Sequence, residues 1–320
     1  MVISNGATCV ITLLSYVLAD DGDVFLISSP FYTVLDHDVN VLTKNSLVRC
    51  PLLGQEKGEF SLHVDSYKHG YEKAQLDGLR VRGIIIVNPG NPVGDIYDER
   101  TLMPILEFAA EKQLHVIVDE IYALSTFTTL HEPFQSILSY KHLPDPKRTH
   151  FVWAFSKDFS MSGVRVGVLY SSIEVCMIAS KVNFSFLPSG AVQGLMMSLL
   201  SDKEWTNRYV RTNKERLTEK FYSVKKQLEL MSDGRIKVYE AQAGLFIWAD
   251  FGLYLNEKSF DEELKLFNMI FDAGLYITCG KILGCNEPGW FRLIFSVKDS
   301  WIEEGLIRLK TALNKYEFNT

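Results

Sequence analysis

Cysteine is scarce in this sequence, and the few cysteines are not grouped. The 320 residues contain five, which stand far apart at Cys9, Cys50, Cys176, Cys279 and Cys285. Their odd number and wide spacing exclude the cysteine patterns of small disulfide frameworks and structural zinc sites. The seven histidines are also dispersed, and no His-Glu-x-x-His helix occurs. We therefore expect free thiols in a reducing compartment, the cytoplasm, and no metal centre.

The sequence also lacks a long apolar run, an excess of positive charge and a dinucleotide-binding glycine pattern. Apolar runs such as residues 83–87 are too short to cross a bilayer, and residues 1–4 do not resemble the basic start of a secretory signal. With 33 Lys and Arg against 39 Asp and Glu, the net charge of −6 argues against a nucleic-acid partner. No Gly-x-Gly-x-x-Gly follows a predicted strand, which excludes a Rossmann dehydrogenase. We expect a protein with neither membrane nor nucleic acid among its partners.

Four short apolar runs bounded by turn residues predict buried parallel strands. They cover residues 24–27, 84–87, 116–118 and 151–154. Helical patterns lie between or before them, for example at 97–113, where apolar residues recur at helical spacing behind the predicted N-cap Asp98. Strands that alternate with helices predict an α/β fold, with a mostly parallel sheet and helices on both of its faces.

The pattern changes after residue 201. Residues 203–231 are highly charged and contain no Gly or Pro, which predicts one long helix with a solvated face. Short strands in GLFIWAD and WFRLIFS follow, together with amphipathic helices at 260–273 and 301–318. This α+β arrangement predicts a smaller C-terminal domain. We therefore divide the chain into a large domain, 1–205, and a connecting helix with a small domain, 206–320.

In open α/β sheets ligands bind beyond the carboxyl ends of the strands, and unusual residues stand at those places here. Ala7 and Thr8 open a helix whose N–H groups and hydroxyl could hold an anion, although such a start is commonly only a cap. After the first predicted strand, Tyr32 either offers its face to a planar ring or is simply a packed aromatic residue. After the second strand, the stiff loop NPGNPVG either aims the amide of Asn91 into a site or only forms a turn.

Two charged side chains follow the other strands. Asp119 ends the third strand, where a buried carboxylate needs a cation or strong donors unless it caps a helix. Lys157 follows the fourth strand, and in a partly dry pocket it could condense with a carbonyl, although most single lysines are exposed loop residues. Arg165 comes eight residues later, and the small residues Ser160, Ser162 and Gly163 would keep the space behind Lys157 clear.

Together these residues meet the needs of pyridoxal 5′-phosphate (PLP). This cofactor requires a lysine for its aldehyde, an acid for its pyridine nitrogen, donors for its phenolate oxygen and a cup for its phosphate. Candidates for all of these occur at the ends of the predicted strands. The sequence therefore predicts a PLP site.

The chain resembles the class I/II aminotransferase superfamily and, within it, the branch similar to 1-aminocyclopropane-1-carboxylate synthase. The resemblance rests on the segments NGAT, NPGNPVGDIY, VIVDEIYALS, SKDFSMSGVRVGVLY, AGLFIWAD and EPGWFRLIFS. It implies the PLP-dependent transferase fold of type I, which has a mostly parallel sheet and a smaller α+β C-terminal domain. By family analogy it also implies an amino acid as the small-molecule substrate and a homodimer.

The resemblance further implies a role for each candidate residue. Lys157 would bind the cofactor aldehyde and move protons at the substrate α-carbon, and Asp119 would keep the ring nitrogen protonated. Arg292 would bind the substrate α-carboxylate through its planar fork of donors. The remaining implied contacts are Asn91 and Tyr122 at the phenolate oxygen, Tyr32 on the ring face, and Ala7, Thr8 and Arg165 at the phosphate.

Two departures from the family pattern bear on function. Ala154 stands where the family has Ser or Gly three residues before the lysine, and a lost hydroxyl there would weaken phosphate binding by about 1.5–3 kcal/mol. The phosphate cradle begins at Gly6, whereas family members carry a long preceding segment that supplies a dimer arm and part of the substrate pocket. We therefore expect either of two functions. The chain is a PLP-dependent lyase or aminotransferase, such as one that catalyses α,γ-elimination on S-adenosylmethionine, or an inactive relative that serves as a binding or regulatory protein.

Overall fold

The four predicted strands lie next to one another in one sheet. The computed structural model describes residues 1–52, 58–130 and 132–318. The strands are β2 (Val24–Ser29), β4 (Val81–Val87), β5 (His115–Asp119) and β6 (Thr149–Ala154). β2 pairs with β4, β4 with β5, and β5 with β6, in each case in parallel. The predicted parallel core of the sheet is therefore confirmed.

Three further strands complete the seven-stranded sheet, whose order is β1-β7-β6-β5-β4-β2-β3. β3 (Ser46–Pro51) adds a parallel strand at one edge, while β7 (Gly167–Tyr170) and β1 (Val2–Ser4) are antiparallel to their neighbours at the other. The sequence did not predict these strands. In the edge strand β3 only Cys50 is buried, so no continuous apolar run marks it.

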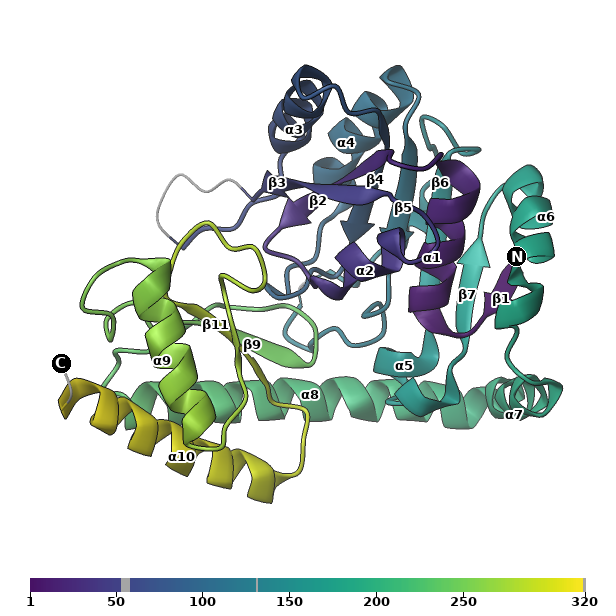
Figure 1. Cartoon of the computed structure of the whole chain (residues 1–320). Coiled ribbons are helices and arrows are strands. Elements are labelled where there is room, and N and C mark those ends of the chain that lie inside the picture. Colours follow the sequence, from purple (N-terminus) through teal and green to yellow (C-terminus); the bar gives the residue numbers. More distant parts are fainter. Residues whose placement is uncertain (53–57, 131, 319–320) are drawn as a thin grey trace.

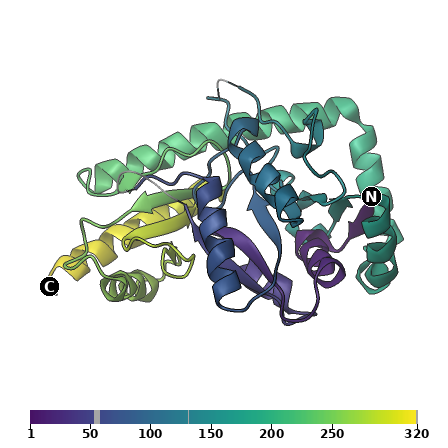
Figure 2. The same ribbon diagram turned by 90° about the horizontal axis from the view of Figure 1, so that it is seen from above.

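Helices cover both faces of this sheet, as Figures 1 and 2 show. They are α3 (Val64–Leu76) and α4 (Glu99–Glu111) on one face, and α1 (Gly6–Leu18) and α2 (Val34–Asn40) on the other. Leu26 packs with the first pair and its neighbour Phe25 with the second, because successive strand residues point to opposite faces. The predicted cap Asp98 begins α4, and its carboxylate accepts a 2.8 Å hydrogen bond from the N–H of Thr101.

The long charged stretch forms α8 (Lys203–Met231), with the bounds predicted from the sequence. Figure 1 shows that α8 runs along both the large sheet and a second, smaller one. The smaller sheet is antiparallel, in the order β10-β11-β9-β8. Its strands are β8 (Lys237–Val238), β9 (Phe246–Asp250), β10 (Thr278–Cys279) and β11 (Trp290–Ile294).

Two helices, α9 (Phe260–Asp272) and α10 (Asp299–Phe318), pack with α8 against the smaller sheet. Their shared core includes Phe221 of α8, Leu266 of α9 and Phe291 of β11, all fully buried. The predicted fold class, a mostly parallel sheet followed by a smaller α+β part, is confirmed. The division of the chain at residue 205 stays a prediction.

Short helices make the remaining connections. They are η1 (Ile137–Ser139), α5 (Phe155–Asp158), η2 (Ser162–Val164), α6 (Ile173–Val182), η3 (Asn183–Phe186) and α7 (Gly190–Ser201). Within the described ranges, no single helix is long and apolar enough to cross a membrane. The pair Ile173–Phe186 and Gly190–Ser201 reaches that length and composition only when taken together, across a bend of 117°.

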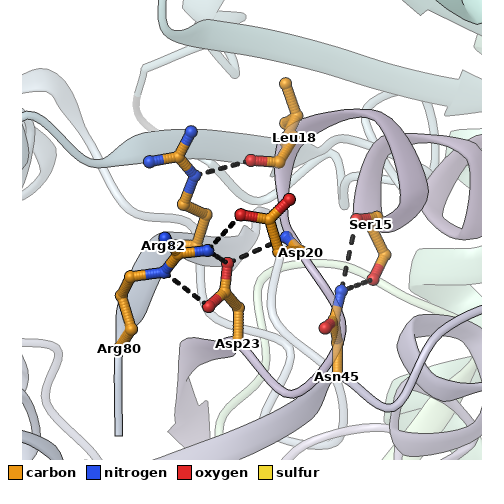
Figure 3. A network of polar contacts seen from close by, with 7 residues as sticks. All are labelled: Ser15, Leu18, Asp20, Asp23, Asn45, Arg80 and Arg82. Atoms are coloured by element: carbon orange, nitrogen blue, oxygen red, sulfur yellow. Dashed lines mark hydrogen bonds and ion pairs between the residues drawn. The ribbon is translucent and has the colours of Figure 1, made fainter.

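A polar network holds the C-terminal end of α1 against the strands (Figure 3). Arg80, at the start of β4, pairs with Asp20 and Asp23 in the turn between α1 and β2. Asn45 donates hydrogen bonds to the backbone oxygen and the hydroxyl of Ser15 at 3.3 and 3.1 Å. This end of α1 therefore lies at the amino ends of the strands, and its N-terminal end lies at their carboxyl ends.

Candidate active site

A pocket of about 140 Å³ lies at the carboxyl ends of β4, β5 and β6. Its lining includes Val87 and Asp119, the last residues of β4 and β5, and Lys157, which follows β6. Every candidate residue except Arg292 lines this pocket: Ala7, Thr8, Tyr32, Asn91, Asp119, Tyr122, Lys157 and Arg165. The fold thus brings together side chains from the start of the chain to the segment after β6.

Lys157 reaches the pocket from α5, a single helical turn that begins directly after β6. Apolar packing fixes this turn, since Phe155 is only 2% exposed. Burial lowers the pKa of the Lys157 amine, and the positive charges of Arg292 and Arg165 lower it further. The negative charge of Asp119 acts in the opposite direction. A lowered pKa increases the fraction of neutral amine near pH 7, which is the form that acts as a nucleophile or base.

Asp119 is the last residue of β5, and its carboxyl group is buried. The N–H of Ile121 donates a hydrogen bond to Oδ1 at 3.2 Å. Burial raises the pKa of Asp119 to about 7, and the negative charges of Asp38, Glu120 and Asp158 add to the rise. A cationic group beside it would favour the ionised form. The site therefore suits a ligand with a protonated ring nitrogen.

Asn91 and Tyr122 are joined directly. Asn91 Nδ2 donates a hydrogen bond to the Tyr122 hydroxyl at 3.2 Å. Tyr122 is 5% exposed, and burial raises the pKa of its phenol, so it stays protonated and can donate. Its ring meets Phe246 of β9 edge-on, at 5.4 Å between centroids. The pair places an amide and a phenol on the same side of the pocket.

Arg292 lies outside the pocket lining but is connected to it. Its Nη1 donates a hydrogen bond to Asn91 Oδ1 at 3.0 Å, and its Nη2 donates to Thr278 Oγ1 at 3.3 Å. Thr278 of β10 is the cross-strand partner of Arg292 in β11. The guanidinium lies 6.0 Å from the centre of the Tyr32 ring. Its buried Nε has no hydrogen-bond partner among the described residues, which leaves a donor for an anion.

The N-terminal end of α1 forms a cup with Arg165. The N-cap residue Asn5 makes no side-chain capping bond, so the first N–H groups of the helix stay available to an anion. Arg165 donates from Nη2 to the Asn5 carbonyl and from Nη1 to the Ser162 carbonyl, both at 3.0 Å. Gly6 has φ +84°, and a Cβ there would lie 2.4 Å from Arg165 Nη2. Glycine at this position therefore lets the guanidinium approach the helix start.

Some features of the site differ from the sequence-based expectations. Ser162 lines the pocket as expected, but a Cβ at Gly163 would have no atom within 4 Å, so the expectation that Gly163 clears space is wrong. Asp38 and Thr278 were not predicted. Asp38 lies inside a short helix and Thr278 in a two-residue strand, so neither follows a recognisable strand end.

This fold and this constellation define a class of protein. The chain matches aminotransferase class I and II over residues 1–309 and belongs to that family. It is 38% identical to 1-aminocyclopropane-1-carboxylate synthase-like protein 1 of Bos taurus, over 98% of the chain and 63% of the relative. It is 37% identical to the probable inactive 1-aminocyclopropane-1-carboxylate synthase-like protein 2 of Homo sapiens, over 99% of the chain and 55% of the relative. The predicted resemblance is confirmed.

Solved structures agree with the fold. The aromatic aminotransferase from Pyrococcus horikoshii superposes with a TM-score of 0.81 at 23% identity, over 98% of this chain and 79% of that one. The chain spans between half and two thirds of the length of the bovine and human relatives.

Membership of this family implies pyridoxal phosphate as the cofactor, which confirms that prediction. The residues present fit it. The uncapped start of α1 and Arg165 suit its phosphate, the buried Asp119 suits its ring nitrogen, and Tyr122 with Asn91 suits its phenolate oxygen.

Proposed function

We propose that the chain is a PLP-dependent enzyme that acts on an amino acid, either by elimination, as in a 1-aminocyclopropane-1-carboxylate synthase, or by transamination. The observation that carries this proposal is that Lys157 and Asp119 line one pocket, where the negative charge of Asp119 raises the pKa of the Lys157 amine. A nucleophilic amine opposite a buried acid is the pair that this cofactor requires.

The residues of the pocket would have the following roles. When bound, pyridoxal phosphate supplies an electron sink for negative charge at the substrate α-carbon. Lys157, with its lowered pKa, holds the cofactor aldehyde and moves the proton at the substrate α-carbon. Asp119 keeps a proton on the ring nitrogen, and Asn91 and Tyr122 orient the ring through its oxygen. Ala7, Thr8 and Arg165 hold the phosphate, and Tyr32 packs on the ring face.

Arg292 would bind the α-carboxylate of the substrate. Its Nη1 and Nη2 are already oriented by Asn91 and Thr278, and its Nε is free for an anion. A planar guanidinium binds a carboxylate through two parallel hydrogen bonds. An amino acid held there would have its carboxylate next to Asn91, which lines the same pocket as Lys157.

The second candidate is an inactive relative that keeps the fold and serves as a binding or regulatory protein. The name of the human relative, probable inactive, favours it. Ala154, which is fully buried, also favours it, because the position lacks the hydroxyl that the sequence resemblance implies for the phosphate.

Product analysis distinguishes the two candidates. The protein is incubated with PLP and either S-adenosylmethionine or pairs of amino acids and 2-oxo acids, and the products are identified by mass spectrometry. An elimination product or a new amino acid that the Lys157→Ala variant does not form would support the enzyme. Cofactor binding without any product would favour the inactive relative.

We further propose that a second copy of the chain covers α6, η3 and α7, in the homodimer expected from the family. Ile173, Met177, Phe184 and Met197 are 76, 60, 81 and 70% exposed, an unusual amount of apolar surface for neighbouring helices. Light scattering after size-exclusion chromatography should give the mass of a dimer, and Phe184→Asp should give a monomer. A wild-type monomer would refute this proposal.

A further inference from the structure

A buried carboxyl group that has no role in the proposed function lines the same pocket. Asp38 lies in α2 and is only 2% exposed. It lines the pocket together with Ala7, Thr8 and Arg165, which form the proposed phosphate cup. Its Oδ1 has no hydrogen-bond partner among the described residues. Since buried polar atoms are normally paired, this oxygen needs either a proton of its own or a ligand atom.

The hydrogen-bonding groups of a phosphate show which form of Asp38, ionised or protonated, can lie beside it. An ionised carboxylate can only accept hydrogen bonds, and a phosphate group also accepts them. Two such anions side by side would repel each other. A protonated carboxyl group, in contrast, carries one O–H donor that a phosphate oxygen can accept. The neutral form of Asp38 is therefore compatible with a bound phosphate, and the ionised form is not.

The Thr8 side chain acts on Asp38 and lowers the pKa of its carboxyl group. A hydroxyl has one proton, so if Thr8 donated it to Asp38, only the Thr8 backbone N–H would be left to donate to the phosphate. Protonated Asp38 would supply a further O–H donor.

The charges around Asp38 come from several elements. Burial raises its pKa to about 6, against the opposing effects of Thr8 on α1, His37 on α2 and Arg165 after η2. Asp38 also interacts electrostatically with Cys9 on α1, Asp119 on β5 and Tyr32. A bound phosphate adds negative charge and would raise the pKa further.

We infer that Asp38 is a further cofactor-binding residue, whose carboxyl group is protonated when the phosphate is bound and donates that proton to a phosphate oxygen. Binding of the phosphate is therefore coupled to the uptake of one proton at Asp38. This inference rests on the proposed function, because it requires a phosphate-bearing cofactor in the pocket.

Calorimetry in buffers of different ionisation enthalpy counts the protons taken up on binding. The ligand is pyridoxamine 5′-phosphate, which has no aldehyde to react with Lys157. At pH 7 a group with a pKa of about 6 is roughly nine-tenths ionised, so the wild type should take up about 0.9 proton more than Asp38→Asn. Wild-type affinity should also fall relative to Asp38→Asn as pH rises above 6, by up to about tenfold per pH unit.

Asp36→Asn is the matched control, because it removes one carboxylate from the same helix at a partly exposed position outside the pocket lining. It should behave like the wild type. Asp38→Ser serves as a second variant without an ionisable group, in case Asp38→Asn does not fold.

The results distinguish failure of the inference about Asp38 from failure of the proposed PLP-dependent function. Equal proton uptake by the wild type and both Asp38 variants would overturn the inference while leaving the cofactor site intact. Failure of the folded wild type to bind either pyridoxamine 5′-phosphate or PLP would overturn the proposed function and the inference with it.

Discussion

Replacing Arg292 by Lys keeps the positive charge but removes the planar fork of donors. In the structure the guanidinium donates to Asn91 at 3.0 Å and to Thr278 at 3.3 Å, and its Nε is free. A lysine ammonium can maintain only part of this arrangement and cannot form two parallel bonds to a carboxylate. The loss of one charge-assisted hydrogen bond corresponds to about 1.5–3 kcal/mol, which is a roughly 10- to 150-fold weaker affinity for an amino acid.

The assay follows the visible absorbance of bound cofactor during titration with L-alanine, L-aspartate or S-adenosylmethionine. PLP affinity should change less than amino-acid affinity in Arg292→Lys, because Arg292 does not line the cofactor pocket and acts on it only through Asn91 and its positive charge, which lysine keeps. Arg308→Lys, at a partly exposed pair with Glu304 on α10, is the control and should match the wild type. Weaker PLP binding with unchanged amino-acid binding would refute the assignment of Arg292 to the substrate.

Three further predictions concern the cup, the turn that carries Lys157, and pH. Gly6→Ala should weaken PLP binding at least about tenfold in a fluorescence titration, because φ +84° costs an alanine about 1–2 kcal/mol and its Cβ would displace Arg165. Asp158→Ala should lower the free energy of unfolding in urea by about 3 kcal/mol, because it leaves one buried and two partly buried donors unpaired. The free energy of unfolding of the cofactor-free protein, taken relative to that of Asp119→Asn, should fall as pH rises from about 4 to about 7, because the pKa of Asp119 is about 7 in the folded state against an ordinary 3.8.

Matched variants control each of these measurements. Gly163→Ala places its Cβ in open space and should leave PLP affinity unchanged. Asp65→Ala removes an exposed helix pair with Lys68 and should change stability by less than about 1 kcal/mol. Asp119→Asn should remove the Asp119 contribution to the dependence of stability on pH between 4 and 7, because that carboxyl group no longer binds a proton in the folded state. If Gly163→Ala lost as much PLP affinity as Gly6→Ala, the steric cause given for Gly6 would be wrong. If Asp65→Ala lost as much stability as Asp158→Ala, the unpaired donors would not explain the loss. If Asp119→Asn kept the pH dependence of the wild type, Asp119 would not be its source.

Much of the large sheet could be predicted from the sequence, because its central strands are buried on both faces and therefore form short apolar runs. Asp119 and Lys157 could be identified for the same reason, since each follows such a run directly. The antiparallel strand β7 and the edge strand β3 were missed, because neither has such a run with clear turn residues at both ends.

The rest of the site depends on tertiary contacts that a sequence pattern does not contain. Arg292 bonds to Asn91 across 201 positions of the chain, and only the placement of the smaller sheet brings the two together. Asp38 sits in a polar helical stretch where a solvent-exposed carboxylate would be the ordinary expectation, yet α1 buries it. The space beside Gly163 likewise depends on packing, and the expectation for that residue was wrong.

The most direct test of the proposed site is the attachment point of the cofactor. The protein is incubated with PLP, its visible spectrum is recorded, and after borohydride reduction the modified peptide is identified by mass spectrometry. We predict a visible band and a label on Lys157, both absent from Lys157→Ala and both retained by Lys112→Ala, whose lysine pairs with Glu111 on the surface. A colourless protein, or a label at any other lysine, would contradict the assignment of Lys157 as the residue that binds the cofactor.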